Sequence, residues 1–211
     1  MVKTRVSKAV LSRLPIYLAY LKDLPDDRDH ISATAISQAL KMGEVLVRKD
    51  LAMICEGGKP RVGYLVADLL HALETYLGYR DDTPAVLVGT GKLGRALLDY
   101  VGFSEYGLRI VAGFDSNYAM EGNTEKGKQI YHIQKLPRIC VENEVKIGII
   151  TVPQSSAQSV CDMLIDAGIK AIWNFAPVHL RVPQGIVVKN ENLAVSLALL
   201  SKTFKDLNEL N

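Results

Sequence analysis

Three glycines with the spacing G-x-G-x-x-G, namely Gly89, Gly91 and Gly94, lie between an apolar run and a helical pattern in VLVGTGKLGRALLDY (86–100). A glycine loop that joins a strand to a helix lets the backbone approach a pyrophosphate, which then faces the N-terminus of the helix. In this scheme Gly89 allows the tight turn, Gly91 the close approach, and Gly94 the packing of helix on strand. The spacing therefore predicts a dinucleotide site.

Asp115 completes this pattern, because it ends the next apolar run, 21 residues beyond Gly94. A carboxylate at that place accepts hydrogen bonds from the hydroxyls of the adenosine ribose. It also repels a 2′-phosphate, so we predict NADH and NAD+ rather than the phosphorylated nucleotides. The alternative is an ordinary turn of this fold that holds no nucleotide.

Groups for hydride-transfer chemistry are harder to find. An enzyme of this class needs an acid–base group and a substrate pocket beside the nicotinamide. The histidines that follow the glycine loop are His132 and His179, and neither has a Ser, Cys or Asp at a spacing that suggests a catalytic set. The sequence thus offers a cofactor site without visible catalytic residues, which is typical of a sensor and not of an enzyme.

The elements around the glycine loop alternate between strands and helices. This alternation predicts a parallel sheet covered on both faces, the doubly wound α/β class. Ser155 and Gln158 form a candidate capping box for the last of the inner helices. We expect strands at 85–89, 109–115, 145–153, 170–175 and 185–189, helices at 92–101, 133–143 and 156–167, and a final amphipathic helix at 192–210.

The first 80 residues are predicted to be helical. Apolar residues recur at helical spacing from Val10 to Leu21, with Pro15 marking a bend or a new start. Ser32 is a candidate N-cap of a short helix, and Gly43 separates that helix from a second one. The turn residues of EGGKPRVGYLV (56–66) suit a two-stranded hairpin. Two short helices and a hairpin are typical of a winged helix-turn-helix, and the polar stretch 78–84 is the expected boundary.

Composition is that of an ordinary globular chain of 211 residues, 48% hydrophobic and 23% charged. The formal net charge is +2, and residues 1–80 carry a mild basic excess that includes Lys3 and Arg5. We expect no signal peptide and no membrane span. Cys55, Cys140 and Cys161 are isolated in sequence, so we expect buried thiols in a reducing cytoplasm and neither a disulfide nor a metal site.

Several motifs together resemble the bacterial redox-sensing transcriptional repressors of the Rex family, over nearly the whole chain. The order of TVP, AQ and NFAP is more specific than the glycine loop. The matching segments are SRLPIYL (12–18), VRKDL (47–51), VGY (62–64), GTGKLGRALLDYVGF (89–103), FDSN (114–117), TVPQSSAQ (151–158), AGIKAIWNFAP (167–177) and the helix after Asn192.

This resemblance implies a homodimer that binds palindromic operator DNA, is released by NADH, and controls genes of fermentation and NADH reoxidation. It implies a winged-helix DNA-binding domain at 1–80 (helix-turn-helix about 15–54, wing about 56–66), a Rossmann NAD(H)-binding domain at 81–191, and a dimerisation helix at 192–211 that is exchanged between subunits. The site residues implied are Gly89, Thr90, Gly91, Lys92, Leu93, Gly94, Asp115, Thr151, Val152, Pro153, Asn174, Phe175, Ala176 and Pro177 for the cofactor, Arg13, Arg48, Lys49, Lys59 and Arg61 for DNA, and Tyr100 and Asn192 for the dimer and its switching.

The chain departs from the family pattern mainly in the DNA-reading part. Gly43 stands where the family usually has Ser or Thr, and Leu46 where it has Gln. Glu44 adds an acid, and Asn192 replaces an Asp. Three functions therefore stay open: an NADH-sensing repressor, a diverged NAD(H)-binding homologue with an altered or lost DNA target, and a small NAD-dependent oxidoreductase or CoA-binding protein.

Overall fold

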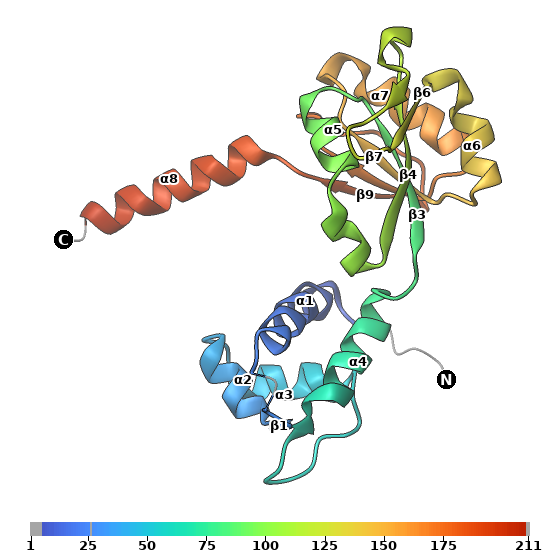
Figure 1. Cartoon of the computed structure of the whole chain (residues 1–211). Helices are drawn as coiled ribbons and strands as arrows, with labels where there is room; N and C mark the ends of the chain where they lie inside the picture. The colour runs from blue at the N-terminus through green and yellow to red at the C-terminus, as the bar shows by residue number, and fades with distance from the viewer. Residues whose placement is uncertain (1–5, 26, 210–211) are drawn as a thin grey trace. The chain divides into compact units, whose positions relative to one another are not determined.

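The computed structural model describes residues 6–25 and 27–209, so Lys3 and Arg5 lie outside the described residues. The chain forms two compact units, residues 1–81 and 82–211 (Figure 1). The division falls inside the polar stretch 78–84. It follows α4, which ends at Leu77 and is capped by Gly78 in the left-handed conformation (φ 74°). Glycine adopts that conformation without the steric cost of a Cβ atom, so the helix stops here.

The first unit is helical and packs around one apolar cluster. Leu14 and Tyr17 of the first helix, Ile36 of the second, Leu51 of the third and Leu69 of the fourth are fully buried in it. Their helical spacing is the pattern that the sequence predicted. The elements are α1 (Lys8–Lys22), β1 (His30–Ile31), α2 (Ala33–Ala39), α3 (Glu44–Ala52), β2 (Tyr64–Leu65) and α4 (Val66–Leu77).

Two local expectations for this unit are confirmed. The Ser32 hydroxyl caps α2 by accepting the N–H of Ala35 at 3.0 Å. Gly43 is the N-cap of α3 and separates it from α2. Of the two expectations for Pro15, a bend or a new start, the new start is wrong, because α1 continues through it. Its neighbours Leu14 and Tyr17 are fully buried in the apolar cluster, which holds this helix in place.

The hairpin expected at 56–66 is also wrong in detail. Strand β2 pairs with β1, about 34 residues earlier in the chain, and not with the segment directly before it. The loop between α3 and β2 closes through one bridge, Lys59 with Gly63. Gly63 has φ +88°, and a Cβ there would lie 2.3 Å from the carbonyl oxygen of Ile31, so the turn packs tightly against β1. The wing is therefore a short closed loop, in which residues 60–62 form the turn inside the bridge and the next residues, Tyr64 and Leu65, pair with β1.

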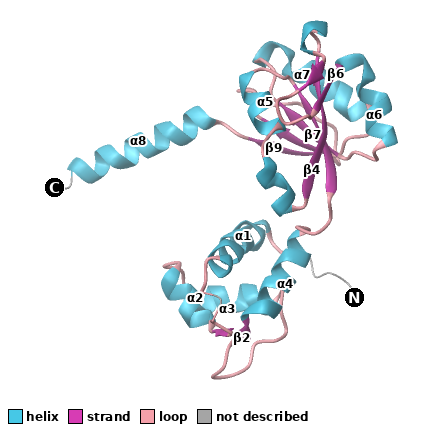
Figure 2. Ribbon diagram, viewed as in Figure 1, coloured by secondary structure: helices cyan, strands magenta, loops and turns pink. Residues whose placement is uncertain are grey.

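The second unit is built on a seven-stranded sheet, which confirms the doubly wound α/β class (Figure 2). The order is β5-β6-β4-β3-β7-β8-β9, with every neighbouring pair parallel except β5–β6. The sequence missed β5 and β6, which are short. The strands are β3 (Thr83–Val88), β4 (Leu108–Asp115), β5 (Gly122–Asn123), β6 (Gln129–His132), β7 (Ile147–Ile150), β8 (Ala171–Asn174) and β9 (Val187–Asn190).

Alternate residues of β3 show how the two faces of the sheet are covered. Val86 and Val88 pack in the cluster that contains the inner faces of α6 and α7, whereas Leu87 packs with Leu98 of α5 on the other face. This alternation is the two-residue period of a strand that is buried on both sides. The helices are α5 (Lys92–Leu98), α6 (Leu136–Glu142) and α7 (Gln154–Asp166), with 3-10 turns η1 (Val101–Tyr106), η2 (Tyr118–Met120) and η3 (Ile133–Lys135).

The capping box expected at Ser155 and Gln158 is wrong. Helix α7 begins two residues earlier than expected, at Gln154, with Pro153 as its N-cap. Gln158 instead accepts the backbone N–H of Arg181 at 2.9 Å and donates to the Arg181 carbonyl at 3.0 Å. Its amide thus ties the second turn of α7 to the loop that contains Arg181.

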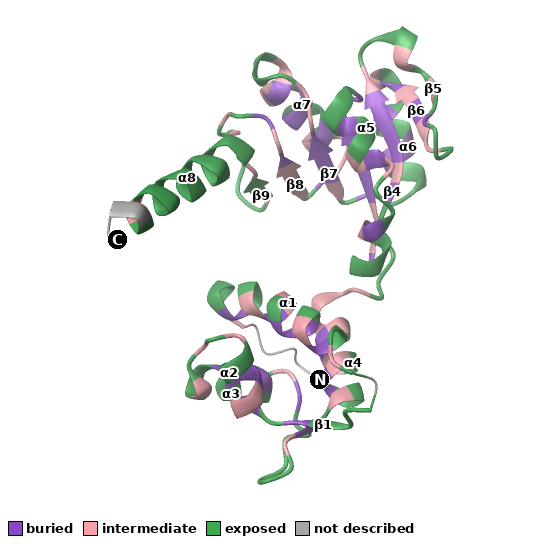
Figure 3. Ribbon diagram, turned by 60° about the vertical axis from the view of Figure 1, so that its left-hand side comes forward, coloured by how far each residue is buried: buried purple, intermediate pink, exposed green. Residues whose placement is uncertain are grey.

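The C-terminal helix α8 (Leu193–Glu209) is amphipathic, and its apolar side chains are exposed along its length (Figure 3). In the part of the chain that the structure describes, no helix is long and apolar enough to cross a membrane. The three cysteines are free and buried, as expected. Burial raises the pKa of Cys140 and of Cys161 to about 11.

Candidate functional site

A cleft of about 710 Å³ opens at the carboxyl ends of the central parallel strands, where β3 has β4 on one side and β7 on the other. The chain reverses its direction of travel across the sheet between these strands. Such a switch point is where open α/β sheets bind ligands. The cleft is lined by Val88, Gly89, Gly91, Leu93, Asp115, Ser116, Asn117, Met120, Ile133, Thr151, Val152, Pro153, Ser156, Ser159, Val160, Met163, Phe175, Ala176 and Pro177.

The three motif glycines have three different environments. Gly89 has φ +98°, and a Cβ there would lie 2.8 Å from the backbone of Thr151. A Cβ at Gly94 would lie 1.9 Å from the carbonyl oxygen of Gly89, so this glycine lets α5 pack on the strand. A Cβ at Gly91 would meet no atom within 4 Å. Gly91 therefore leaves space in the cleft at the N-cap of α5, where backbone N–H groups attract a phosphate.

Asp115 lies in the cleft at the end of β4, and three local donors hold its carboxylate. Oδ2 accepts the N–H of Thr90 at 2.8 Å and its hydroxyl at 2.9 Å, and Oδ1 accepts the N–H of Asn117 at 3.0 Å. Burial acts to raise the pKa of Asp115, but the hydrogen bonds from Asn117 and Thr90 outweigh it and lower the pKa. Asp115 is thus ionised at neutral pH, and its half-buried carboxylate lines the cleft.

The far wall of the cleft comes from the ends of β7 and β8. Thr151 donates its hydroxyl to the carbonyl of Gly89 at 2.7 Å, which fixes the glycine turn against β7. Asn174 is fully buried, and its amide donates to Ala176 O, Val178 O and Asn190 Oδ1. These bonds shape the backbone that presents Phe175, Ala176 and Pro177 to the cleft.

The structure thus brings most of the expected cofactor residues together, with exceptions. Thr90 is buried beneath Asp115, and Asn174 supports the wall without lining it. Lys92 and Gly94, in the first turn of α5, are also not among the lining residues. Residues that sequence reasoning missed include Ser156, Ser159, Val160 and Met163, which form one face of α7, and Ser116, Asn117, Met120 and Ile133 on the opposite side.

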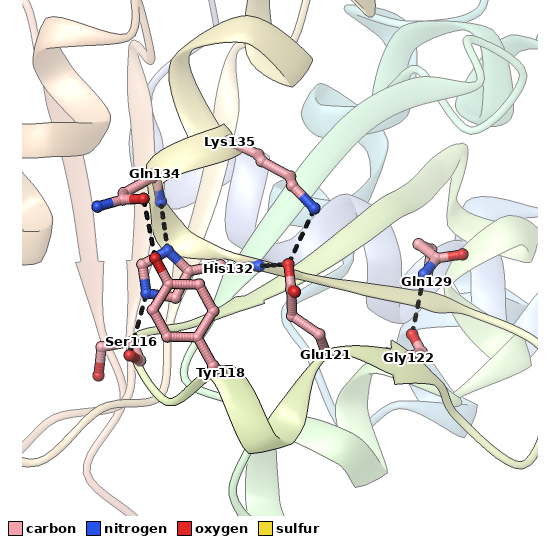
Figure 4. A network of polar contacts seen from close by, with 8 residues as sticks. All are labelled: Ser116, Tyr118, Glu121, Gly122, Gln129, His132, Gln134 and Lys135. Carbon is pink, nitrogen blue, oxygen red and sulfur yellow. Dashed lines mark hydrogen bonds and ion pairs between the residues drawn. The ribbon is translucent and has the colours of Figure 1, made fainter.

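A polar network holds the loop that carries Ser116 (Figure 4). The rings of Tyr118 and His132 stack with centroids 3.7 Å apart. Gln134 N–H donates to Nδ1 of His132, so Nε2 carries the proton and donates to the carbonyl of Ser116 at 3.1 Å. Glu121 accepts the N–H of His132 at 2.7 Å. His132 is therefore a structural residue of the cleft rim, as its isolation in the sequence indicated.

A second cleft, of about 520 Å³, lies in the first unit between the start of α2, α3 and the wing loop. Its lining contains three of the five basic residues expected to meet DNA, namely Arg48, Lys59 and Arg61. Lys49 is exposed on the outer face of α3. Arg48 forms an exposed ion pair with Glu44, one turn earlier on the same helix. The structure thus gathers a positively charged surface at α3 and the wing, with one carboxylate inside it.

Arg13 lies elsewhere, in a nearly buried cluster of α1 and α3. Its Nε donates to Asp50 at 2.7 Å and its Nη2 at 3.0 Å, while the hydroxyl of Tyr17 donates to the same carboxylate at 2.8 Å. Burial acts to raise the pKa of Asp50, but the hydrogen bonds from Arg13 and Tyr17 outweigh it and lower the pKa. Burial, followed by the bond to Asp50, raises the pKa of Tyr17 to about 12. The guanidinium of Arg13 therefore ties α1 to α3 through the carboxylate of Asp50.

A redox-sensing transcriptional repressor Rex of Porphyromonas gingivalis is 42% identical over 97% of this chain and 94% of its own. The chain belongs to the Rex family. A family model described as "CoA binding domain" matches residues 80–178, and one described as "Putative DNA-binding protein N-terminus" matches residues 5–52. The Rex family is one of transcriptional repressors, so membership places the chain outside the oxidoreductases that share its sheet.

Solved structures of RSP, a Rex-family repressor, have the same fold. The complex of RSP with β-NAD+ and operator DNA has a TM-score of 0.88 and 32% identity, with 98% of each chain covered. The complex with β-NADH has a TM-score of 0.86 over the same shares.

Tyr100 and Asn192, the two residues expected at the dimer contact and in its switching, contact residues near them in the sequence. Tyr100 is exposed, and its ring packs edge-on against Phe103 at 4.9 Å between centroids. The side chain of Asn192 accepts the N–H of Val195 at 3.1 Å and so caps the start of α8. An Asp can make the same cap, so the Asn that replaces the usual Rex residue preserves the helix start and removes a charge.

Proposed function

We propose that this chain is an NAD(H)-responsive transcriptional repressor that binds operator DNA as a dimer and is released by NADH. The cleft at the switch point of the sheet is the observation that carries the proposal. Its glycine turn leaves room at Gly91, and the ionised carboxylate of Asp115 lines the same cleft. A pyrophosphate fits the first feature, and an adenosine ribose hydroxyl fits the second.

In this proposal the expected residues divide by ligand. The adenosine half lies near Asp115, the pyrophosphate at Gly89–Gly94, and the nicotinamide near Asn174, Phe175, Ala176 and Pro177, with Thr151, Val152 and Pro153 between. Residues 1–80 bind DNA through Arg48, Lys49, Lys59 and Arg61, with Arg13 positioning α3 through Asp50. Residues 81–191 bind NAD(H). The amphipathic α8 joins two copies, and a two-fold dimer requires a palindromic operator.

In this proposal the dimer lies in the cytoplasm and represses genes of fermentation and NADH reoxidation. NADH and DNA weaken each other by the same factor, because a coupling free energy between two sites is reciprocal. A coupling of about 1–3 kcal/mol corresponds to an affinity change of roughly 5- to 150-fold. NAD+ occupies the same cleft and leaves the dimer able to bind.

The test is fluorescence anisotropy of labelled DNA from the gene's own upstream region, titrated with the full-length chain in NAD+ and then with NADH. We expect saturable, salt-sensitive binding that NADH reverses and that CoA at the same concentration leaves unchanged. Arg48→Ala should weaken the binding and leave NADH affinity unaltered. Arg138→Ala, an exposed arginine of α6, is the matched control and should change neither. Binding that ignores NADH would refute the proposed sensing.

One observation favours a second candidate, an NAD(H)-binding homologue with an altered DNA target. The Glu44–Arg48 pair occupies an arginine that would otherwise be available for a phosphate or a base. Tight NADH binding with no shift of the upstream DNA would support this candidate. Selection from a random DNA library with the same sample would then identify the altered target or show that none is bound.

A further inference from the structure

The outer face of α3 is apolar where a DNA-reading helix is usually polar. Val45 is 64% exposed, Leu46 42% and Met53 52%. These residues share a face with Lys49, since residues three, four and seven apart lie on one side of a helix. The inner face of the same helix buries Val47 and Leu51 completely. The core of the unit is therefore already filled, and the outer apolar residues serve some other contact.

The surroundings of this face select a polyanion as its partner. Lys49 lies on the face itself, and Arg48, Lys59 and Arg61 line the neighbouring cleft. Lysines and arginines next to exposed aliphatic side chains suit DNA, whose phosphates flank the bases in the major groove. A protein groove would be expected to carry acidic groups to match, whereas DNA supplies its negative charge at every step.

The first turn of α3 limits what it can read. In a helix-turn-helix the N-terminal residues of the second helix contact the edges of the bases. Here that turn holds Glu44, Val45 and Leu46, of which none has a side chain that donates a hydrogen bond. The Glu44 carboxylate is paired with Arg48. The feature of the major groove that aliphatic groups recognise is the 5-methyl group of thymine.

We propose that Val45 and Leu46 recognise thymine methyl groups in each half of the operator, so that this chain reads its DNA by apolar contact at these positions. The inference rests on the proposed function, because it requires that α3 enter the major groove. Arg48 and Lys49 then supply the neighbouring phosphate contacts.

The test replaces thymine by uracil, which removes the methyl group and keeps every donor and acceptor of the base pair. The operator duplex is prepared in both forms, and the full-length chain is titrated with NAD+ present. We expect uracil to weaken binding about fourfold for each methyl group that the protein covers, or about fifteenfold for one methyl in each half-site. The variant V45A/L46A should bind the two duplexes within about twofold of each other.

A matched variant, Val141→Ala, truncates an exposed valine on α6 of the other unit and should keep the full sensitivity to uracil. Equal binding of the two duplexes by the native chain would overturn the inference while the proposed function stands. Sensitivity that persists in V45A/L46A would also overturn it, because the methyl groups would then act through DNA shape. Failure to bind any DNA would overturn both.

Discussion

Replacing Asp115 by alanine tests the nucleotide site most directly. The Asp115 carboxylate accepts hydrogen bonds from Thr90 and Asn117 and lines the cleft, where a ribose hydroxyl would donate a further one. A hydrogen bond to a charged group contributes about 1.5–3 kcal/mol, so Asp115→Ala should raise the Kd for NADH on the order of 10- to 150-fold.

Selectivity against NADPH should fall at the same time. The hydrogen bonds that lower the pKa of Asp115 keep it ionised at neutral pH, where it repels a 2′-phosphate. Without the carboxylate, this repulsion disappears and the ratio of the two affinities moves toward one. Asp166→Ala, which removes an exposed carboxylate at the end of α7, is the control and should leave both affinities unchanged.

The assay uses the single tryptophan of the sequence. The ring of Trp173 lies 4.5 Å, between centroids, from Phe175 in the cleft wall. Bound NADH should therefore accept excitation energy from Trp173, and titration of that signal gives both affinities. Circular dichroism of each variant confirms that it is folded. A folded Asp115→Ala protein with unchanged preference for NADH would refute the assignment of the ribose to this carboxylate.

Three further predictions concern the supports of the two sites. Asp50→Asn should lower the free energy of unfolding in urea by about 3 kcal/mol, because it removes one partner of an ion pair whose carboxylate is buried. The folded state lowers the pKa of Asp50, so this difference should persist at neutral pH and be lost progressively as the pH falls from about 4, the unfolded-state pKa, through the lower folded-state pKa. A difference that does not change with pH would contradict this prediction. Glu44→Gln should strengthen DNA binding and steepen its dependence on log salt by about one, whereas an unchanged slope would show that no phosphate approaches there. Gly91→Ala should weaken NADH binding and leave thermal stability unchanged, while Gly94→Ala should lower both because its Cβ meets the carbonyl of Gly89; equal stabilities would mean that the loop adapts.

The parts of the fold with a strong periodic signal were predictable from the sequence. The apolar runs that became β3, β4 and β7 are buried on both faces of the sheet, and such runs read as continuous hydrophobic stretches. The glycine turn and Asp115 were predictable because their chemistry requires those residues at that spacing. The small elements were not. Strand β5 has two residues and pairs only because β6 lies beside it.

The helical wall of the cleft was missed for a different reason. Ser156, Ser159 and Met163 recur at an ordinary helical spacing, and residues of these types do not by themselves indicate a ligand site. Their place in the cleft follows from how α7 packs on β7, which is a long-range property. The wing was mispredicted for the same reason, since β2 pairs with a strand about 34 residues earlier in the chain. Local sequence describes local preference, and these features depend on tertiary partners.

The burial of Cys140 and Cys161 bears on whether this protein can store an oxidation event. With a pKa of about 11, fewer than roughly one in a thousand of the Cys140 and Cys161 side chains are thiolates at neutral pH, and oxidants react with the thiolate. A sensor that oxidises its own cysteines stores the event until a reductase clears it. The proposed sensor would instead respond by exchanging one dissolved nucleotide for another. Its state would follow the present composition of the nicotinamide pool, and Cys140 and Cys161 would keep no record of an earlier one.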